Sequence, residues 1–127
     1  MENIFRIKAA EDTPEVNFNK DSGEFSLSGR SLPEDAFAFY GPVKTWLKEY
    51  IKQPANRSDL KISLDYFNSS SVKQILELIL LFEEISVSGK NASIIWCFYE
   101  GDDLMEIKGK EFESMVDKIP FEFRMIS

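Results

Sequence analysis

The sequence predicts a single α/β domain in which one layer of mixed β-sheet is packed by helices, with an α+β arrangement as the alternative. Its 127 residues match the usual size of one domain, and 43% of them are hydrophobic, which is enough for one core. Two alternating segments near the start favour a hairpin, whereas later strand-like segments are separated by segments with helical spacing of apolar residues. Such separation favours parallel pairing, and the predicted order is β-β-α-β-α-β-α-β.

The chain begins with a short charged stretch, residues 1–13, which we expect to be a tail or a minor edge strand. The single domain then covers residues 14–127. Polar and apolar residues alternate over residues 15–19 and 24–29, and the four residues between these segments have turn chemistry. The two segments therefore predict a β-hairpin with one buried face.

A helix is expected after the hairpin. Its apolar residues recur at helical spacing, and they are Val43, Trp46, Leu47, Tyr50 and Ile51. Because a proline is tolerated in the first turn of a helix but not deep inside it, Pro42 predicts a regular helix over residues 42–52. Residues 35–40 are then expected to form a separate turn or a kinked extension.

Strands and helices alternate in the rest of the chain. In order, they are a strand over residues 60–67, a helix over 72–85, a strand over 92–99, a helix over 104–116 and a strand over 121–126. Alternation in the first of these strands places Tyr66 on the same face as Leu60, Ile62 and Leu64. The second strand is almost continuously apolar, so we expect it to be buried on both faces. Gly109 has a low helix propensity and makes the prediction of the last helix weaker.

The helix over residues 72–85 has a wide apolar sector of roughly 200°, against the stripe of about 100° that core packing needs. Leu81 falls in the remaining, polar sector. Two interpretations stay open. The helix is either buried deep in the centre of the fold, or it offers part of its surface to a partner.

Composition and charge exclude several classes of function. The formal charge of −7 disfavours nucleic acid and an anionic membrane as partners, and it favours proteins. The absence of histidine removes Ser-His-Asp and Cys-His catalysis and histidine-ligated metals. The single cysteine, Cys97, lies in an apolar run, which predicts a buried thiol in a reducing compartment. With neither a signal-peptide pattern nor a run long enough to span a bilayer, we expect a cytoplasmic protein without membrane insertion.

Three hydroxyls lie where the strand over residues 60–67 meets the next helix, in the run Asn68-Ser69-Ser70-Ser71. Asparagine and serine are favoured N-caps, so one of these residues is expected to cap the helix. The free amides and the positive end of the helix dipole would also accommodate a phosphoserine, which carries about −1.5 to −2 charges. The run therefore predicts capping, phosphorylation or both.

Acidic residues offer a weaker alternative site. Glu100, Asp102, Asp103 and Glu106 have oxygens that suit a hard cation, but a solvated turn and an acidic helix start explain them better. A metal-dependent hydrolase that uses Asp65, Asp102 and Asp103 is a rival function from another class. We expect no catalytic residues, no metal and no other cofactor.

Five segments in the same order resemble the SiaC family of bacterial regulatory phosphoproteins, and together they cover the chain from Thr13 to its end. They are Pro14-Glu15-Val16 with Phe18, residues 29–34, residues 39–43 with Trp46, Leu47 and Tyr50, residues 64–71, and residues 96–100 with Asp102, Asp103, Met105, Glu111 and Phe112. The resemblance implies a small protein without enzymatic activity that acts in cyclic di-GMP and biofilm signalling. It further implies a dedicated protein kinase, a metal-dependent serine/threonine phosphatase, and a diguanylate cyclase that the unphosphorylated protein binds and activates.

The resemblance also carries site residues. The family's acceptor is a threonine directly after the asparagine of the Tyr-Phe-Asn motif, and by position the acceptor here is Ser69, which keeps the hydroxyl. The expected surroundings of this phosphosite are Asn68, Ser70, Ser71 and Lys73. The expected partner-binding residues lie at the end of the strand and on the helix, and they are Tyr66, Val72, Leu76 and Leu80. The fold and the acceptor's position also resemble the STAS-like anti-sigma-factor antagonists, whose partner switch is the alternative function.

Overall fold

A computed structural model of the chain describes residues 2–127, which form one six-stranded sheet and three helices. In chain order the elements are β1 (Ile4–Ile7), β2 (Glu15–Asn19), β3 (Glu24–Ser31), α1 (Ala36–Tyr50), β4 (Arg57–Phe67), α2 (Ser69–Val87), β5 (Asn91–Tyr99), α3 (Asp103–Glu113) and β6 (Phe121–Ile126). The structure confirms the predicted mixed sheet packed by helices. The strand β1 adds one element at the start of the predicted order.

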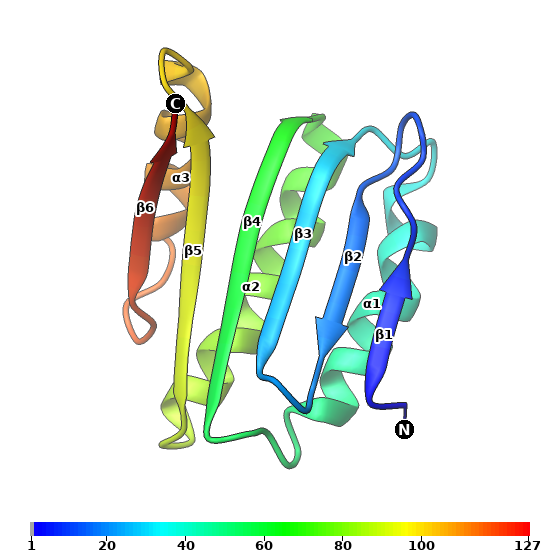
Figure 1. Cartoon of the computed structure of the whole chain (residues 1–127), viewed down its shortest axis with the longest axis vertical. Coiled ribbons are helices and arrows are strands. Elements are labelled where there is room, and N and C mark those ends of the chain that lie inside the picture. Colours follow the sequence, from blue (N-terminus) through cyan, green and yellow to red (C-terminus); the bar gives the residue numbers. More distant parts are fainter. Residues whose placement is uncertain (1) are drawn as a thin grey trace.

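The strands lie side by side in the order of the chain, from β1 at one edge to β6 at the other. β1, β2 and β3 pair antiparallel, whereas β3, β4, β5 and β6 pair parallel. Right-handed crossovers that always advance in the same direction leave their helices on the same face of a sheet. Figure 1 accordingly shows α1, α2 and α3 behind the sheet, with the other face toward the viewer.

The first helix is longer than predicted. α1 begins at Ala36 rather than Pro42, and the predicted separate turn is its first turn. Asp35 caps it, because its carboxylate accepts a hydrogen bond from the amide of Ala38 at 3.0 Å. Pro42 removes one bond within the helix, but Tyr40 in the preceding turn is fully buried. Tertiary packing of this turn therefore outweighs the local cost of the proline.

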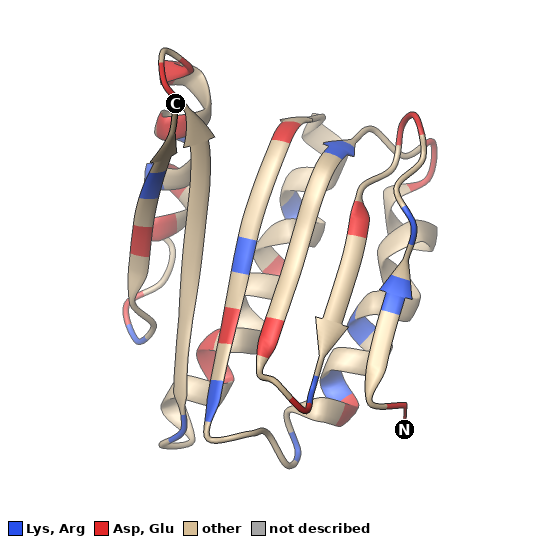
Figure 2. Cartoon of the chain, viewed as in Figure 1, with Lys and Arg blue, Asp and Glu red and all other residues tan. Residues whose placement is uncertain are grey.

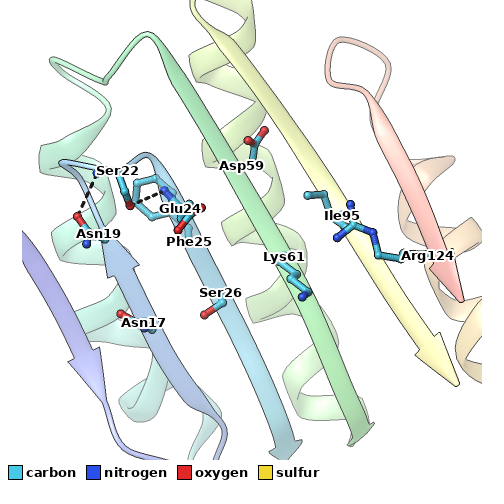
Figure 3. A pocket seen from close by; sticks show the side chains of 10 residues that line it. All are labelled: Asn17, Asn19, Ser22, Glu24, Phe25, Ser26, Asp59, Lys61, Ile95 and Arg124. Carbon is cyan, nitrogen blue, oxygen red and sulfur yellow. Dashed lines mark hydrogen bonds between the residues drawn. The ribbon is translucent and has the colours of Figure 1, made fainter. Parts of the chain in front are cut away.

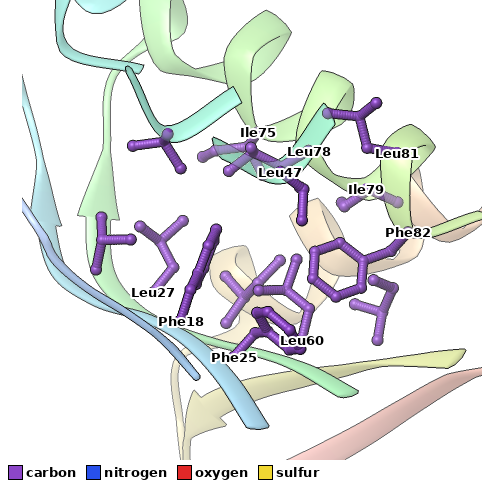
Figure 4. Packing of buried hydrophobic residues seen from close by; sticks show 14 of the residues in the cluster. Phe18, Phe25, Leu27, Leu47, Leu60, Ile75, Leu78, Ile79, Leu81 and Phe82 are labelled. Atoms are coloured by element: carbon purple, nitrogen blue, oxygen red, sulfur yellow. The ribbon is translucent and has the colours of Figure 1, made fainter. Parts of the chain in front are cut away.

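The core lies between the sheet and the helices. Inward-facing residues of β2, β3 and β4 meet the apolar face of α2 there (Figure 4). Phe25 lies between two other rings in edge-to-face contact, with centroid distances of 5.3 Å to Phe18 and 5.2 Å to Phe82. These contacts join the hairpin of β2 and β3 to α2.

The prediction that the strand over residues 92–99 is buried on both faces is wrong. Residues of β5 alternate between buried and partly exposed over most of its length, because all three helices lie on the same side. Cys97 is buried, as predicted, and burial raises the pKa of its thiol. Gly109 has a packing role in α3, since a Cβ atom at this position would lie 2.5 Å from the ring of Trp96.

Candidate functional site

The candidate site lies at the start of α2, directly after β4. Asn68 has an extended backbone and caps the helix, as the sequence predicts for one residue of this run. Its Oδ1 atom accepts hydrogen bonds from the amide of Ser71 at 3.1 Å and from the hydroxyl of Ser71 at 2.8 Å. The cap therefore holds the first turn of α2 against the end of β4.

A β-bulge shapes the end of β4. Gly29 of β3 lies opposite Leu64, but the next residue of β3 lies opposite Tyr66, so Asp65 is the extra residue. The bulge reverses the alternation, and Tyr66 is 47% exposed whereas Phe67 is 2% exposed. The prediction that Tyr66 shares the buried face of Leu64 is therefore wrong. Its exposure instead makes Tyr66 accessible beside the start of α2.

A chain of buried hydrogen bonds connects the cap to α1. The Ser71 hydroxyl lies 2.8 Å from the hydroxyl of Ser31 at the end of β3, which in turn lies 2.6 Å from the phenol oxygen of Tyr40. Burial raises the pKa of Tyr40 to about 12, so the phenol is neutral at ordinary pH. Sequence reasoning missed Ser31 and Tyr40 as site residues, although both lie in segments that carry the family resemblance.

The three serines of the run differ in environment. Ser71 is completely buried, and Ser70 is exposed but donates its hydroxyl to Asn68 Oδ1 at 3.0 Å. Ser69 is the first residue of α2 and is exposed, and within residues 2–127 its hydroxyl has no hydrogen-bond partner. Lys73 is also exposed, one helical turn after Ser69. Among the three serines, Ser69 thus has the hydroxyl that is exposed and makes no hydrogen bond to another described residue.

A small groove of about 120 Å³ adjoins this turn, between the start of α2 and α3. It is lined by Phe67, Val72, Lys108, Glu111, Phe112 and Met115. The ammonium of Lys108 lies 4.5 Å from the ring centroid of Phe67 and 5.5 Å from that of Tyr66. The site therefore brings Tyr66 and Val72 close to a cation that sequence reasoning missed, since no local motif marks Lys108.

The wide apolar sector of α2 is used by two neighbours, the sheet and α1. Between the two helices, Lys44 Nζ donates to Glu77 Oε2 at 2.7 Å, and this hydrogen bond lowers the pKa of Glu77. Leu81, which was predicted in the polar sector, is buried. Leu76 is partly buried, whereas Leu80 remains 38% exposed. α2 is therefore a central helix that still exposes some apolar surface.

Comparison with known proteins then identifies the family. The family model described as SiaC family regulatory phosphoprotein matches residues 7–126. The chain belongs to the SiaC family. A protein of Pseudomonas aeruginosa strain UCBPP-PA14 without an assigned function is 26% identical over 106 residues, which are 84% of each chain.

Solved SiaC structures from Pseudomonas aeruginosa have the same fold. One superimposes with a TM-score of 0.87 at 23% identity, and it covers 98% of this chain and 100% of its own. Another is SiaC in complex with the diguanylate cyclase SiaD, whose activator it is, with a TM-score of 0.89 at 24% identity and coverage of 96% and 99%. Both matches extend over nearly the whole chain, β1 to β6.

The acidic residues that a metal-dependent hydrolase would use have separate structural roles in this SiaC family chain. Asp102 caps α3, because its carboxylate accepts a hydrogen bond from the amide of Met105 at 3.1 Å. Asp65 is the exposed extra residue of the bulge in β4. In the part of the chain that the structure describes, no group of three His, Cys, Asp or Glu residues is placed to hold a metal ion. The hydrolase alternative therefore has no assembled site among these residues.

A second hollow, of about 410 Å³, lies on the helix-free face of the sheet (Figure 3). Residues from five strands, β2 to β6, line it, among them Asn17, Ser26, Lys61 and Arg124. No residue of the predicted phosphosite is part of this hollow.

Neither α2 nor any other helix within residues 2–127 is long and apolar enough to cross a membrane.

Proposed function

We propose that this chain is a non-enzymatic regulatory phosphoprotein of the cytoplasm, with Ser69 as the acceptor of the phosphate. A cognate protein kinase adds the phosphate and a serine/threonine phosphatase removes it. The unphosphorylated form binds and activates a diguanylate cyclase. Membership of the SiaC family supports this function, as does the solved complex of a SiaC with the cyclase SiaD.

The observation that carries the proposal is the difference among the three hydroxyls at the start of α2. A kinase must reach the oxygen that it modifies, and Ser71 is completely buried. Phosphorylation of Ser70 would remove the hydrogen bond that its hydroxyl donates to the capping residue Asn68. Ser69 is exposed and its hydroxyl makes no such bond. This difference favours Ser69 over its neighbours.

The proposed switch acts through local charge. A phosphate on Ser69 would add about −1.5 to −2 charges at the positive end of the α2 dipole, where the fold tolerates them. Lys73 lies four residues further along the helix, the spacing at which opposite charges on a helix meet. The same charge next to Tyr66 and Val72 would oppose the burial of their exposed apolar surface against a partner. Phosphorylation therefore releases the cyclase.

The proposed docking surface consists of Tyr66, Val72, Leu76 and Leu80. The last three residues follow one another at four-residue spacing on α2, which places them on one stripe of the helix. Val72 lines the groove beside α3, and Tyr66 lies next to Lys108. The stripe and the groove together offer an apolar surface with a cation at its side.

Mapping of the phosphate tests the acceptor. The wild-type chain, Ser69→Ala and Ser70→Ala are each incubated with the cognate kinase and ATP, and tryptic phosphopeptides are sequenced. We expect phosphate on Ser69 in the wild type and in Ser70→Ala, and none in Ser69→Ala. Phosphate on Ser70 or Ser71 of the wild type would show that the assignment is wrong.

A cyclase assay tests the output. Cyclic di-GMP formed from GTP by the cognate cyclase is measured with Ser69→Ala, Ser69→Asp and the control Ser69→Asn, which has the size of aspartate without its charge. We expect activation by Ser69→Ala and by the control, and at least ten-fold weaker activation by Ser69→Asp. Equal activation by all three would refute the charge mechanism. Affinity capture with Ser69→Ala that recovers a sigma-factor regulator instead of a cyclase would establish the alternative output.

A further inference from the structure

The outer edge of β6 is open. β6 is the last strand of the sheet, and within residues 2–127 no other strand pairs with its outer side. On the inner side, the carbonyl oxygens of Pro120 and Ile126 accept hydrogen bonds from β5 and the following turn, at 2.9 and 2.7 Å. Peptide groups alternate in direction along a strand, so Phe121, Phe123 and Met125 direct their N–H and C=O groups outward. Such a row of free groups is a template for another strand.

The sequence of β6 is complementary to itself when read in the opposite direction. Glu122 and Arg124 are exposed neighbours on the helix-free face, and Arg124 Nη2 lies 2.6 Å from Glu122 Oε2. Figure 2 shows an acidic (red) and a basic (blue) segment close together along β6. In an antiparallel pair of two β6 strands about a twofold axis at Phe123, Glu122 of each copy lies opposite Arg124 of the other. Phe123 then faces its own copy, and Phe121 faces Met125.

The direction of the backbone groups is compatible with this register, and the charges distinguish it from the neighbouring registers. With the axis at Phe123, the residues that exchange hydrogen bonds are Phe121, Phe123 and Met125, which are the ones with outward N–H and C=O groups. Glu122 and Arg124 form the intervening pairs, in which side chains come closest. An axis at Glu122 or at Arg124 would place like charges directly opposite each other, which is unfavourable.

The other edge of the sheet lacks this complementarity. β1 has only four residues, and its one charged side chain is that of Arg6. Pairing of two β1 strands would therefore bring no opposite charges together. β6 also offers apolar surface on the helix side, where Phe121 and Phe123 are partly exposed and Met125 is 58% exposed. α3 lies behind β5 and β6, so two copies of α3 would come side by side behind the joined strands (Figure 1).

We propose that β6 is a self-association surface whose partner is a second copy of this chain. The two β6 strands pair antiparallel about a twofold axis at Phe123, and the two sheets become continuous. The Glu122–Arg124 ion pair within each strand is exchanged for two ion pairs between the copies. This dimer does not depend on Ser69 or on a cyclase, so it stands or falls separately from the function proposed above.

Sedimentation velocity over a series of protein concentrations tests the proposal, with circular dichroism as the check of folding. The variants are Glu122→Arg and Arg124→Glu, and Lys61→Glu on central strand β4 is the control with the same charge change as Arg124→Glu. We expect a dimer for the wild type and the control, and at least ten-fold weaker dimerisation for each β6 variant. An equimolar mixture of the two β6 variants should regain the dimer, because opposite charges then face each other across the axis.

Three results would overturn the proposal. The first is a wild type that stays monomeric up to about 1 mM, the range of the weakest specific complexes. The second is a dimer that neither charge reversal weakens, which would place the interface elsewhere. The third is a mixture of the two β6 variants that remains monomeric, since the charge match would then not determine the pairing.

Discussion

Asn68→Ala should destabilise the fold by about 1–2 kcal/mol, the cost typical of removing a helix N-cap. The side chain of Asn68 accepts from the amide of Ser71 and from the hydroxyls of Ser70 and Ser71, at 2.8 to 3.1 Å. The substitution leaves the Ser71 amide without this acceptor. The buried Ser71 hydroxyl still reaches Ser31, at 2.8 Å to its hydroxyl and 3.1 Å to its carbonyl oxygen. The loss should therefore stay near the value for a cap and not include an unpaired buried hydroxyl.

Urea unfolding followed by circular dichroism and by tryptophan fluorescence measures this change. For a chain of 127 residues, the expected loss corresponds to a decrease in melting temperature of ~4–8 °C. Asn68→Asp should retain most of the stability, because aspartate is an equally good cap. Ser70→Ala, which removes only an exposed hydrogen bond, should change the free energy of unfolding by less than about 0.5 kcal/mol. If Asn68→Ala were as stable as Ser70→Ala, the cap would not hold the turn that presents Ser69.

Three further predictions concern packing and pH. Gly109→Ala should cost about 1–3 kcal/mol in thermal unfolding, because its methyl group would overlap a tryptophan ring, whereas Gly41→Ala in α1 has open space and should be neutral or stabilising. Equal stability of these two variants would contradict the packing role. The hydrogen bond from Lys44 lowers the pKa of Glu77 below 4.5, so this pair stabilises the fold above pH 4.5 and the contribution is lost as the pH falls through the lowered pKa. Glu77→Gln should therefore flatten the acid side of a plot of urea midpoint against pH. Burial raises the pKa of Tyr40 from 10.0 to about 12, so stability present below pH 10.0 is lost as the pH rises toward 12, and Tyr40→Phe should reduce that loss in the same measurement.

Local patterns in the sequence were sufficient to predict most of the fold. The hairpin of β2 and β3 follows from strict alternation around a short turn, and α2 follows from a long run of apolar residues at helical spacing. The junction that holds Ser69 was predictable for the same reason. A strand that ends at an asparagine followed by serines is a local signal for a helix start.

The predictions from sequence failed where contacts between residues far apart in the chain determine the local structure. The register between β3 and β4 creates the bulge that exposes Tyr66, and period-two alternation within β4 contains no information about it. Burial of Tyr40 against the sheet outweighs Pro42 in α1, although the local proline rule predicts a later helix start. Ser31 reaches the site through a hydrogen bond to a residue 40 positions away. No window of the sequence brings these residues together.

The hydrogen bonds around Ser69 would let a phosphate on this residue change the surface and leave the fold intact. Asn68 and Ser71 are fixed by hydrogen bonds that extend through Ser31 to Tyr40, so the first turn of α2 is anchored in the core. Ser69 lies outside this network and is exposed. If Ser69 carries the phosphate as proposed, the modification breaks none of these bonds, and the added charge is favourable at a helix N-terminus. Both forms should then show the same hydrogen-exchange protection in α1 and α2. A phosphate that instead exposed α2 amides to exchange would require a switch by unfolding of this turn rather than by charge on its surface.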